Sequence, residues 1–334
     1  MSVGIEDVAK AAGVSTATVS RALRGLKHVN SQTREHVKKI AAEMNYSISV
    51  TASRLASGKT DSIGVVAPYI NRWYFSEVIN GIERSLREAG LDLLLYNFSH
   101  LRNRERLFQH QLLRNRVDAL IVISLPPTKE ELDSMLSLGV PVALIGTHHA
   151  LCASVAIDDV ASARMATQHL VNQGHINIGL ISGMPNDPLS FTVPQDRRRG
   201  FIQVIEENSL AWSTDQEASG DFTLRSGERA MDELLAKPNR PTAVFVASDE
   251  MAFGAMRAIR RHGLNIPEDI SIIGFDGHDM SDFLELTTIE QPVQTIGELA
   301  AWALMEQLKN QSTTPPTVTV PTKLVVRNST ARLM

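Results

Sequence analysis

The side chains best suited to chemistry in this chain are aromatic and polar residues that follow short apolar runs. Trp73, Tyr74 and Phe75 are adjacent, and Tyr69 precedes them, although aromatic residues make up only 5% of the chain. Some of these rings could simply begin the next helix and pack in a core. Because three adjacent aromatics in a loop exceed what packing needs, we expect some of them to contact a ligand.

Polar side chains stand at the ends of later apolar runs. Ser248 and Asp249 follow the run 243–247, Asp276 follows the run 270–275, and Gln291 lies further along. Hydroxyl, carboxylate and amide groups can hydrogen-bond a polyhydroxylated or heteroaromatic ligand. Each aspartate could instead cap the following helix, and for Asp249 this interpretation is as good as ligand contact.

Arginines 197 to 199 form a charge run that would ordinarily be a solvated surface. One of the three, placed at the start of a helix, could instead reach into a cleft. There its guanidinium could pair with two hydroxyl groups or with a carboxylate through parallel hydrogen bonds.

Motifs for catalysis or cofactor binding are missing. The chain contains no G-x-G-x-x-G, G-x-S-x-G or H-E-x-x-H. His148 and His149 would point to opposite sides of an extended stretch, so they make a poor metal pair. Residues 58–60 resemble only the tail of a P-loop, because Ser53 stands where the motif needs glycine. We therefore expect no enzyme, no metal and no cofactor.

Charge is distributed unevenly along the chain. Residues 1–60 contain nine Lys or Arg and four acids, a balance of +5, whereas the whole chain carries −4 and the remainder therefore −9. This asymmetry favours a polyanion as the partner of the N-terminal region, although a basic surface alone can also be just solvated.

The N-terminal pattern predicts two short helices joined at Gly13. Apolar residues recur at helical spacing over 5–12, Ser15 can cap the second helix, and Val19 lies on its apolar stripe. The opposite face would carry Ala17, Ser20, Arg21 and Arg24. This is the pattern of a helix-turn-helix whose second helix enters a DNA major groove.

A third helix with Ser31 as N-cap is expected next, followed by the stretch 47–59, which is rich in Ser, Thr and Ala. This stretch could be a flexible linker. It could also form a helix of about two turns when docked, with Leu55 wedged into a minor groove.

From residue 62 onward, apolar runs alternate with amphipathic stretches. We expect strands at 63–67, 91–96, 119–124, 142–145, 155–157, 178–182, 243–247 and 270–274, with helices at 75–89, 103–115, 129–138, 159–173, 195–208, 224–236, 250–262 and 296–309. This alternation predicts parallel sheets covered by helices. About ten strands favour two sheets, hence two lobes with a ligand cleft beyond the carboxyl ends of the strands.

The cellular compartment of the protein can be predicted from its cysteine content and its apolar runs. The chain has one cysteine, Cys152, and no apolar run long enough to span a membrane. The N-terminus does not look like a signal peptide. We expect a cytoplasmic protein that does not enter the membrane.

Several segments resemble the LacI/GalR family of bacterial repressors. They include D-V-A-K-A-A-G-V-S-T-A-T-V-S-R-A-L, V-N-S-Q-T-R-E-H-V, Q-G-H-I-N-I-G-L-I-S-G, D-R-R-R-G-F, P-T-A-V-F-V-A-S-D-E-M-A-F-G and P-E-D-I-S-I-I-G-F-D-G, in order along the whole chain. The resemblance implies an all-α helix-turn-helix headpiece plus an α/β two-lobed effector domain similar to periplasmic binding proteins. It assigns 1–46 to the headpiece, 47–60 to a hinge helix or linker and 61–334 to the effector domain. The N-lobe would span about 61–160 and 291–319, and the C-lobe about 161–290 and 320–334.

The resemblance also implies site residues. Base-reading positions fall on Thr16, Ala17 and Arg21, phosphate-contacting positions on Ser15, Thr18, Ser20, Asn30, Thr33 and Tyr46, and hinge positions on Ser49, Ala52 and Leu55. Effector-binding positions fall on Tyr69, Trp73, Tyr74, Phe75, Arg197, Phe222, Ser248, Asp249, Asp276 and Gln291. Of the three arginines, Arg197 is therefore the one expected to enter the cleft.

The chain departs from the family at some positions. Ile48 and Ser49 replace the usual Pro-Asn at the hinge, and Gly146 stands where some sugar-binding relatives have an aspartate. There is no C-terminal heptad tail of the kind that makes some relatives tetramers, so the resemblance implies a homodimer on double-stranded operator DNA. The implied effector is a sugar, sugar phosphate or nucleoside. The alternatives are a transport-type ligand-binding protein without a DNA role, and an enzyme of the doubly wound type.

Overall fold

The computed structural model describes residues 3–23, 25, 28–46, 59–98, 104, 112–184, 191–310 and 314–333. These residues form two compact units, 1–61 and 62–334. The hinge positions Ser49, Ala52 and Leu55 lie outside the described residues, as do 103 and 105–111 of the helix expected at 103–115. The end of that expected helix, 112–115, forms a turn instead.

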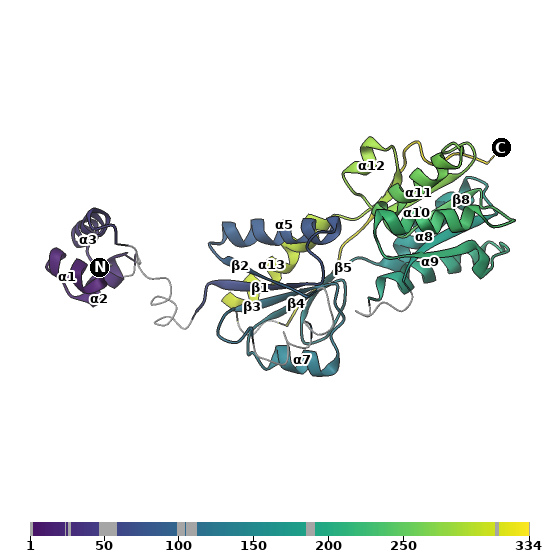
Figure 1. Ribbon diagram of the computed structural model, residues 1–334. Coiled ribbons are helices and arrows are strands. Elements are labelled where there is room, and N and C mark those ends of the chain that lie inside the picture. Colours follow the sequence, from purple (N-terminus) through teal and green to yellow (C-terminus); the bar gives the residue numbers. More distant parts are fainter. Residues whose placement is uncertain are drawn as a thin grey trace. The chain divides into compact units, whose positions relative to one another are not determined.

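The N-terminal unit consists of three helices, α1 (Ile5–Ala12), α2 (Thr16–Leu23) and α3 (Ser31–Glu43), drawn in purple in Figure 1. Gly13 ends α1 in the left-handed conformation, with φ of 66°, as expected for its role in the turn. The amide of Thr18 donates to Ser15 Oγ at 3.2 Å, which caps α2. Buried Val8, Val19 and Val37 bring the three helices onto one small core.

The predicted cap of α3 was wrong by one residue. Asn30 is the N-cap, and its side-chain oxygen accepts from the amide of Thr33 at 2.7 Å, while Ser31 is the first helical residue. Asparagine and serine cap helices about equally well, so two adjacent candidates could not be ranked from the sequence.

The second unit contains two six-stranded sheets, each at the centre of one lobe. The N-lobe strands are β1 (Ser62–Ala67), β2 (Asp92–Asn97), β3 (Ala119–Ile123), β4 (Val142–Ile145), β5 (Ala153–Ala156) and β11 (Thr317–Thr319). They lie in the order β11-β5-β4-β3-β1-β2, and every pair is parallel. β1 and β3 are buried along their whole lengths, because helices or loops cover both faces of the sheet.

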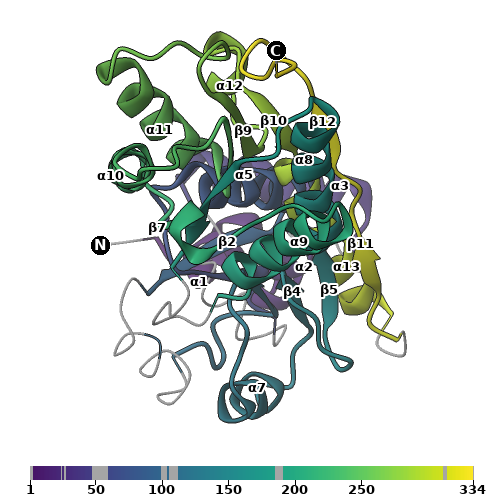
Figure 2. The same cartoon turned by 90° about the vertical axis from the view of Figure 1, so that its right-hand side faces the viewer.

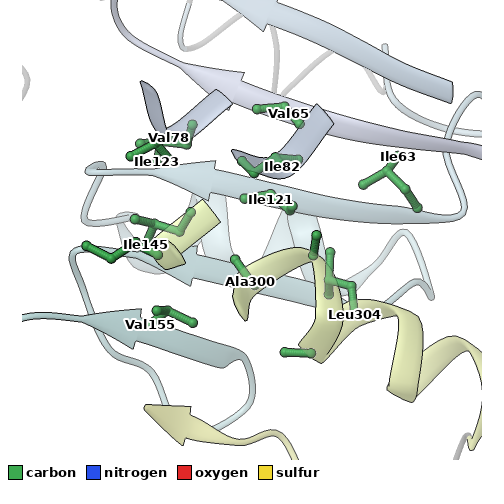
Figure 3. Packing of buried hydrophobic residues seen from close by; sticks show 14 of the residues in the cluster. Ile63, Val65, Val78, Ile82, Ile121, Ile123, Ile145, Val155, Ala300 and Leu304 are labelled. Carbon is green, nitrogen blue, oxygen red and sulfur yellow. The ribbon is translucent and has the colours of Figure 1, made fainter. Parts of the chain in front are cut away.

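Helices α5 (Trp73–Glu88) and α13 (Val293–Lys309) cover one face of the N-lobe sheet. Figure 3 shows Val78 and Ile82 of α5 and Ala300 and Leu304 of α13 over the strand residue Ile121. The short helix α7 (Lys129–Leu136) packs on the other face through Leu132 and Met135.

The C-lobe strands are β6 (Ile178–Gly183), β7 (Glu217–Gly220), β8 (Ala243–Val246), β9 (Ser271–Asp276), β10 (Thr287–Glu290) and β12 (Lys323–Val325). Their order is β12-β10-β9-β8-β6-β7, and β12 alone among these described strands runs antiparallel to its neighbour. β7, β10, β11 and β12 were not among the expected strands, because they are short and lack a continuous apolar run.

Two pairs of helices cover the C-lobe sheet on opposite sides (Figure 2). α8 (Asp159–Asn172) and α9 (Val193–Glu207) form one pair, and α10 (Leu224–Leu235) and α11 (Asp249–Arg261) form the other. The short helices η1 (Thr214–Gln216) and α12 (Met280–Phe283) complete the lobe. The chain passes between the two sheets after β5, after β10 and after β11.

Candidate functional site

A cavity of about 760 Å³, part of it open to solvent, lies between the two lobes. The N-lobe contributes the start of α5 and residues at the carboxyl ends of β3, β4 and β5, including Ser124 and Gly146. The C-lobe contributes the start of α9 and residues that follow β7, β8, β9 and β10. A cavity at the carboxyl ends of parallel strands, lined from both lobes, is where folds of this kind bind small organic ligands.

Seven of the ten predicted effector residues line this cavity. They are Tyr74, Phe75, Arg197, Phe222, Ser248, Asp276 and Gln291. They come from both lobes, so the fold brings together residues that are more than 200 positions apart in the sequence. Tyr69, Trp73 and Asp249 are not among the lining residues.

Arg197 is the buried cation of the site. It stands in the first turns of α9, and its Nε donates to Asp159 at 2.8 Å. Its Nη1 donates to the carbonyl of Ala247 at 2.6 Å and to Asp276 at 3.4 Å. The guanidinium carbon lies 3.5 Å from the centre of the Phe275 ring. These contacts fix the plane of the guanidinium and leave its Nη2 donors to a ligand.

Asp276 is the buried acid of the site, at the end of β9. Its Oδ1 accepts from Gln291 Nε2 at 2.8 Å, and its φ of 130° is rare for a residue with a side chain. Burial raises the pKa of Asp276 to about 8, with Arg197 opposing the shift and the nearby Asp249 adding to it. Backbone strain and an unusual pKa on one residue are features that concentrate at functional sites.

Tyr74 and Phe222 face the cavity from opposite lobes. The Tyr74 hydroxyl is hydrogen-bonded to Ser124, but burial is the stronger effect and raises the pKa of Tyr74 to about 12. Phe222 has a φ of 61°, and a Cβ at Gly183 would overlap its ring. The ring position therefore depends on the glycine at the end of β6. Together the two rings offer flat apolar surfaces beside the Arg197 and Asp276 polar groups.

Asp249 lies beneath the cavity and not in its wall. Its Oδ2 accepts from the amides of Gly277 and His278 at 2.9 and 2.8 Å and from Ser281, and its Oδ1 accepts from Thr288 at 2.7 Å. Both carboxylate oxygens are thus engaged in holding the loop after β9. The helix cap of α11 is Ser248, whose Oγ accepts from the amide of Met251. The position of Asp249 supports a structural role and not effector contact.

Tyr69 and Trp73 also lie outside the cavity wall. The Tyr69 ring contacts Phe75 edge-on with centroids 5.7 Å apart, so it supports a lining residue from behind. Trp73 stacks on His278 of the other lobe, with ring centroids 4.7 Å apart and planes at 23°. Trp73 is therefore placed to hold the lobes together beside the site.

Sequence reasoning missed several lining residues, including Ser124, Asp159, Phe191 and Glu250. Ser124 could have been found, because it is the last residue of the strand expected at 119–124, at the edge where ligands bind. Phe191 sits in a loop after β6 and Glu250 in the first turn of α11, and neither carries a signal in its local sequence.

The candidate DNA-binding residues of the headpiece are grouped on and around α2. Thr16, Ala17 and Arg21 are exposed, whereas Val19 and Ala22 of the same helix are buried. Ser15 and Asn30 are exposed, and Thr18, Ser20, Thr33 and Tyr46 are partly buried. Tyr46 packs against the headpiece core. The exposed face of α2 thus presents a cation and small side chains, which leaves room for a close approach to base edges.

Among the described residues, no helix is long and apolar enough to cross a membrane. In the same part of the chain, no three His, Cys, Asp or Glu side chains are grouped so as to hold a metal ion.

The fold and the cavity define a class: a helix-turn-helix unit joined to a two-lobed ligand-binding module. Residues 4–49 match the model for bacterial regulatory proteins of the lacI family, and residues 167–330 match the periplasmic binding protein-like domain. The chain is 34% identical to the HTH-type transcriptional repressor CytR of Escherichia coli (strain K12), an alignment that covers 98% of this chain and 96% of that protein.

Solved structures agree. The lac repressor dimer bound to operator and the anti-inducer ONPF is 29% identical with a TM-score of 0.89, covering 99% of this chain and 100% of that one. A complex of the transcriptional regulator CelR with cellobiose is 29% identical with a TM-score of 0.72, covering 98% and 99%.

The chain therefore belongs to the lacI family of bacterial regulatory proteins. It is a DNA-binding transcriptional repressor with an effector-binding domain. The predicted fold class, a helix-turn-helix headpiece plus two α/β lobes, is confirmed.

Proposed function

We propose that this repressor binds a pseudo-palindromic operator as a homodimer and that a small molecule in the interlobe cavity controls its affinity. The observation that carries the effector half of the proposal is the cavity itself, with a buried Arg197 and Asp276 facing space between two lobes. Burying an unpaired charge costs free energy, so buried charged side chains are normally paired. Here Arg197 is paired with Asp159 and Asp276, and its Nη2 donors remain for a ligand.

The DNA half of the proposal rests on the exposed face of α2. Arg21 is the base-reading residue, and its guanidinium can donate two parallel hydrogen bonds to a guanine edge. A homodimer places two such helices on two half-sites, which is why the operator should be pseudo-palindromic. The lac repressor structure similar to this chain is a dimer bound to operator, which supports the same arrangement here.

The effector half rests on differential binding. A ligand that contacts residues of both lobes stabilises one angle between them more than another, and so shifts the population that binds operator. Such coupling is typically worth about 1 to 3 kcal/mol. One relative of known structure holds cellobiose, so a sugar or related metabolite is the effector class we favour.

Two variants separate the halves of this proposal. Arg21→Ala should lower discrimination between operator and random DNA by about 1 to 3 kcal/mol per half-site, because one base contact is lost in each, while leaving effector binding intact. Asp276→Ala should remove the effector response and leave operator affinity without effector unchanged. Both effects are measured by fluorescence anisotropy with labelled DNA, after selection of an operator from a random library.

The outcome that contradicts the groove assignment is undiminished discrimination by Arg21→Ala. Glu35→Gln is the headpiece control, since Glu35 is an exposed charged residue of α3 and does not lie on α2, the helix assigned to base reading. An effector response that survives in Asp276→Ala would contradict the cavity assignment.

A further inference from the structure

The charges around the interlobe cavity do not favour an anion. Among the described lining residues, two are cationic, Arg72 and Arg197, and three are acidic, Asp159, Glu250 and Asp276; these lining residues include no lysine or histidine. Their formal balance is −1 with Asp276 ionised and 0 with Asp276 protonated. These described lining residues therefore lack the excess positive charge with which proteins bind phosphate or carboxylate groups.

Arg197 is already paired with two carboxylates. Asp159 lies 2.8 Å from its Nε, and Asp276 lies 3.4 Å from its Nη1. All three side chains are nearly buried, so their interaction is little screened by solvent. An anion that approached the remaining Nη2 donors would meet the Asp159 carboxylate at short range, and also that of Asp276 when Asp276 is ionised. A neutral hydroxyl group could accept from the same donors without that repulsion.

Arg72 is engaged as well. Its guanidinium carbon lies 3.7 Å from the centre of the Tyr69 ring. Its charge also faces two acids of the other lobe, since it lowers the pKa of Asp221 and opposes the burial that raises the pKa of Glu250. An incoming phosphate would have to compete with these partners.

Helix N-termini are the other usual anion sites, and three of those at the cavity carry acids of the chain itself. Asp158 caps α8 and Asp159 begins it, while α11 has Asp249 and Glu250 in its first turn. The first turn of α9 holds Asp196. Among the described helices that border the cavity, α5 and α13 lack an acid in the first turn. The residue at the N-cap of α5 is Arg72, with the partners already described.

From these four observations we infer that the effector is uncharged: a neutral polyhydroxylated molecule, such as a free sugar or a nucleoside, and not its phosphorylated or carboxylated counterpart. Neutral hydroxyls can bond Arg197, Asp276 and Gln291, and a flat sugar face or a base can lie against Tyr74 and Phe222. This inference rests on the proposed function, because it describes the ligand of the same cavity.

The experiment compares matched pairs on the full chain by isothermal titration calorimetry. The pairs are ribose and ribose 5-phosphate, glucose and glucose 6-phosphate, and adenosine and its 5′-monophosphate. In the pair that binds, the neutral member should bind at least about tenfold more tightly, because the anion meets like charges with no unpaired cation.

Two isosteric variants locate the source of the preference. Glu250→Gln removes a carboxylate from the cavity wall. It should narrow the gap in affinity between the neutral and the phosphorylated ligand severalfold. Glu233→Gln is the matched control, since it removes a carboxylate from α10 that does not line the cavity and is more than half exposed; it should leave the gap unchanged.

The failures are distinguishable. Equal or tighter binding of the phosphorylated member overturns the inference and leaves the proposed effector function standing. An equal narrowing by Glu250→Gln and Glu233→Gln also overturns it, because the preference would then come from the overall charge. If a neutral ligand binds tightly but operator affinity does not change, the charge preference stands and the proposed effector control fails.

Discussion

Asp276 combines three features that a purely structural residue would avoid. It is almost completely buried, it is an acid, and it holds a backbone conformation that favours glycine. Gln291 and Arg197 hold its carboxyl group in place, and the amide of Gln291 donates to its carbonyl at 3.2 Å. Strain of this kind persists only where the surroundings over-determine the geometry. We attribute it to the presentation of the carboxyl group to the cavity.

The raised pKa of Asp276 predicts a pH dependence of stability. The carboxyl ionises near 3.8 in the unfolded chain and near 8 in the folded protein. Its contribution is therefore fully present below about pH 4 and is lost as the pH rises towards 8, because the unfolded state releases the proton first. The slope is at most about 1.4 kcal/mol per pH unit. Urea unfolding of the wild type and Asp276→Asn across this range measures it.

The two proteins are compared because other groups titrate in the same range. Asp276→Asn cannot lose a proton at this position, so its free energy of unfolding should fall less steeply with rising pH than that of the wild type. If the free energies of unfolding of the two proteins change with pH in parallel, Arg197 keeps Asp276 ionised in the folded state. That result would contradict the prediction that burial is the stronger effect on the pKa of Asp276.

At the residue scale the sequence could predict some site residues and not others. Arg197, Asp276 and Gln291 were found because they stand in segments with a strong family pattern. Phe191 and Glu250 line the same cavity but owe their positions to the tertiary arrangement of a loop and a helix start. Asp249 carries the same pattern as a site residue yet is directed beneath the site. Residue type and position therefore predicted proximity to the cavity better than contact with it.

At the scale of elements, three helix pairs each have glycine at the point where the two helices cross. α5 and α13 cross at Gly81 and Gly297, α8 and α9 cross at Gly200, and α10 and α11 cross at Gly227 and Gly254. At each of these glycines an added Cβ would overlap a backbone carbonyl oxygen of the partner helix. Without a Cβ the backbones can approach closely, and three of the four sheet faces are covered by compact helix pairs.

Gly227→Ala tests whether the packing of α10 on α11 requires glycine at their crossing. The methyl group would overlap the carbonyl oxygen of Met251, which cannot rotate away as a side chain could. Overpacking of this kind typically costs about 1 to 3 kcal/mol, so the unfolding midpoint in urea should fall accordingly. Gly263→Ala is the control, because its left-handed φ of 73° is strained for alanine but no atom crowds the new methyl group. It should cost only about 1 kcal/mol.

A smaller loss for Gly227→Ala than for Gly263→Ala would show that the α10 and α11 backbones separate at little cost. The close approach would then be permitted by glycine and not required by the packing.

The elements were predicted from the sequence where burial is continuous. β1, β3 and β4 are buried on both faces, so they read as unbroken apolar runs. The short strands β7, β10, β11 and β12 were missed because their pairing depends on neighbours far away in the sequence. Among the described residues the other expected helices are confirmed, because each buries one apolar stripe, but 112–115 of the helix expected at 103–115 form a turn.

At the scale of the whole effector domain, the lobes are joined by three chain crossings and by side-chain contacts beside the cavity. The clearest of these contacts is Trp73 of α5 stacked on His278, which follows β9 in the other lobe. Phe253 meets the same imidazole edge-on at 5.2 Å, and His278 Nδ1 accepts from the amide of Met280 at 3.0 Å. These contacts fix His278 in its own lobe. The stacking of Trp73 on His278 therefore depends on the angle between the two lobes.

Trp73 should report the angle between the lobes. The chain has three tryptophans, so Trp212→Phe with Trp302→Phe leaves Trp73 as the sole one. Phenylalanine at 212 keeps an aromatic ring against Phe201, where the present centroids are 5.9 Å apart. Effector that changes the lobe angle must change the Trp73 to His278 stacking, and the emission of Trp73 should shift with it. Adding His278→Ala to this background should abolish the response.

The same contact should contribute to effector affinity. An aromatic pair is worth about 0.5 to 1.5 kcal/mol, so its loss in His278→Ala should weaken effector binding about twofold to tenfold if the bound lobes keep the stacked arrangement. If binding instead tightens by that factor, the stacked arrangement is the one that effector opposes, and the ligand acts by opening the lobes. Unchanged affinity and unchanged Trp73 emission would together contradict a lobe movement at this contact.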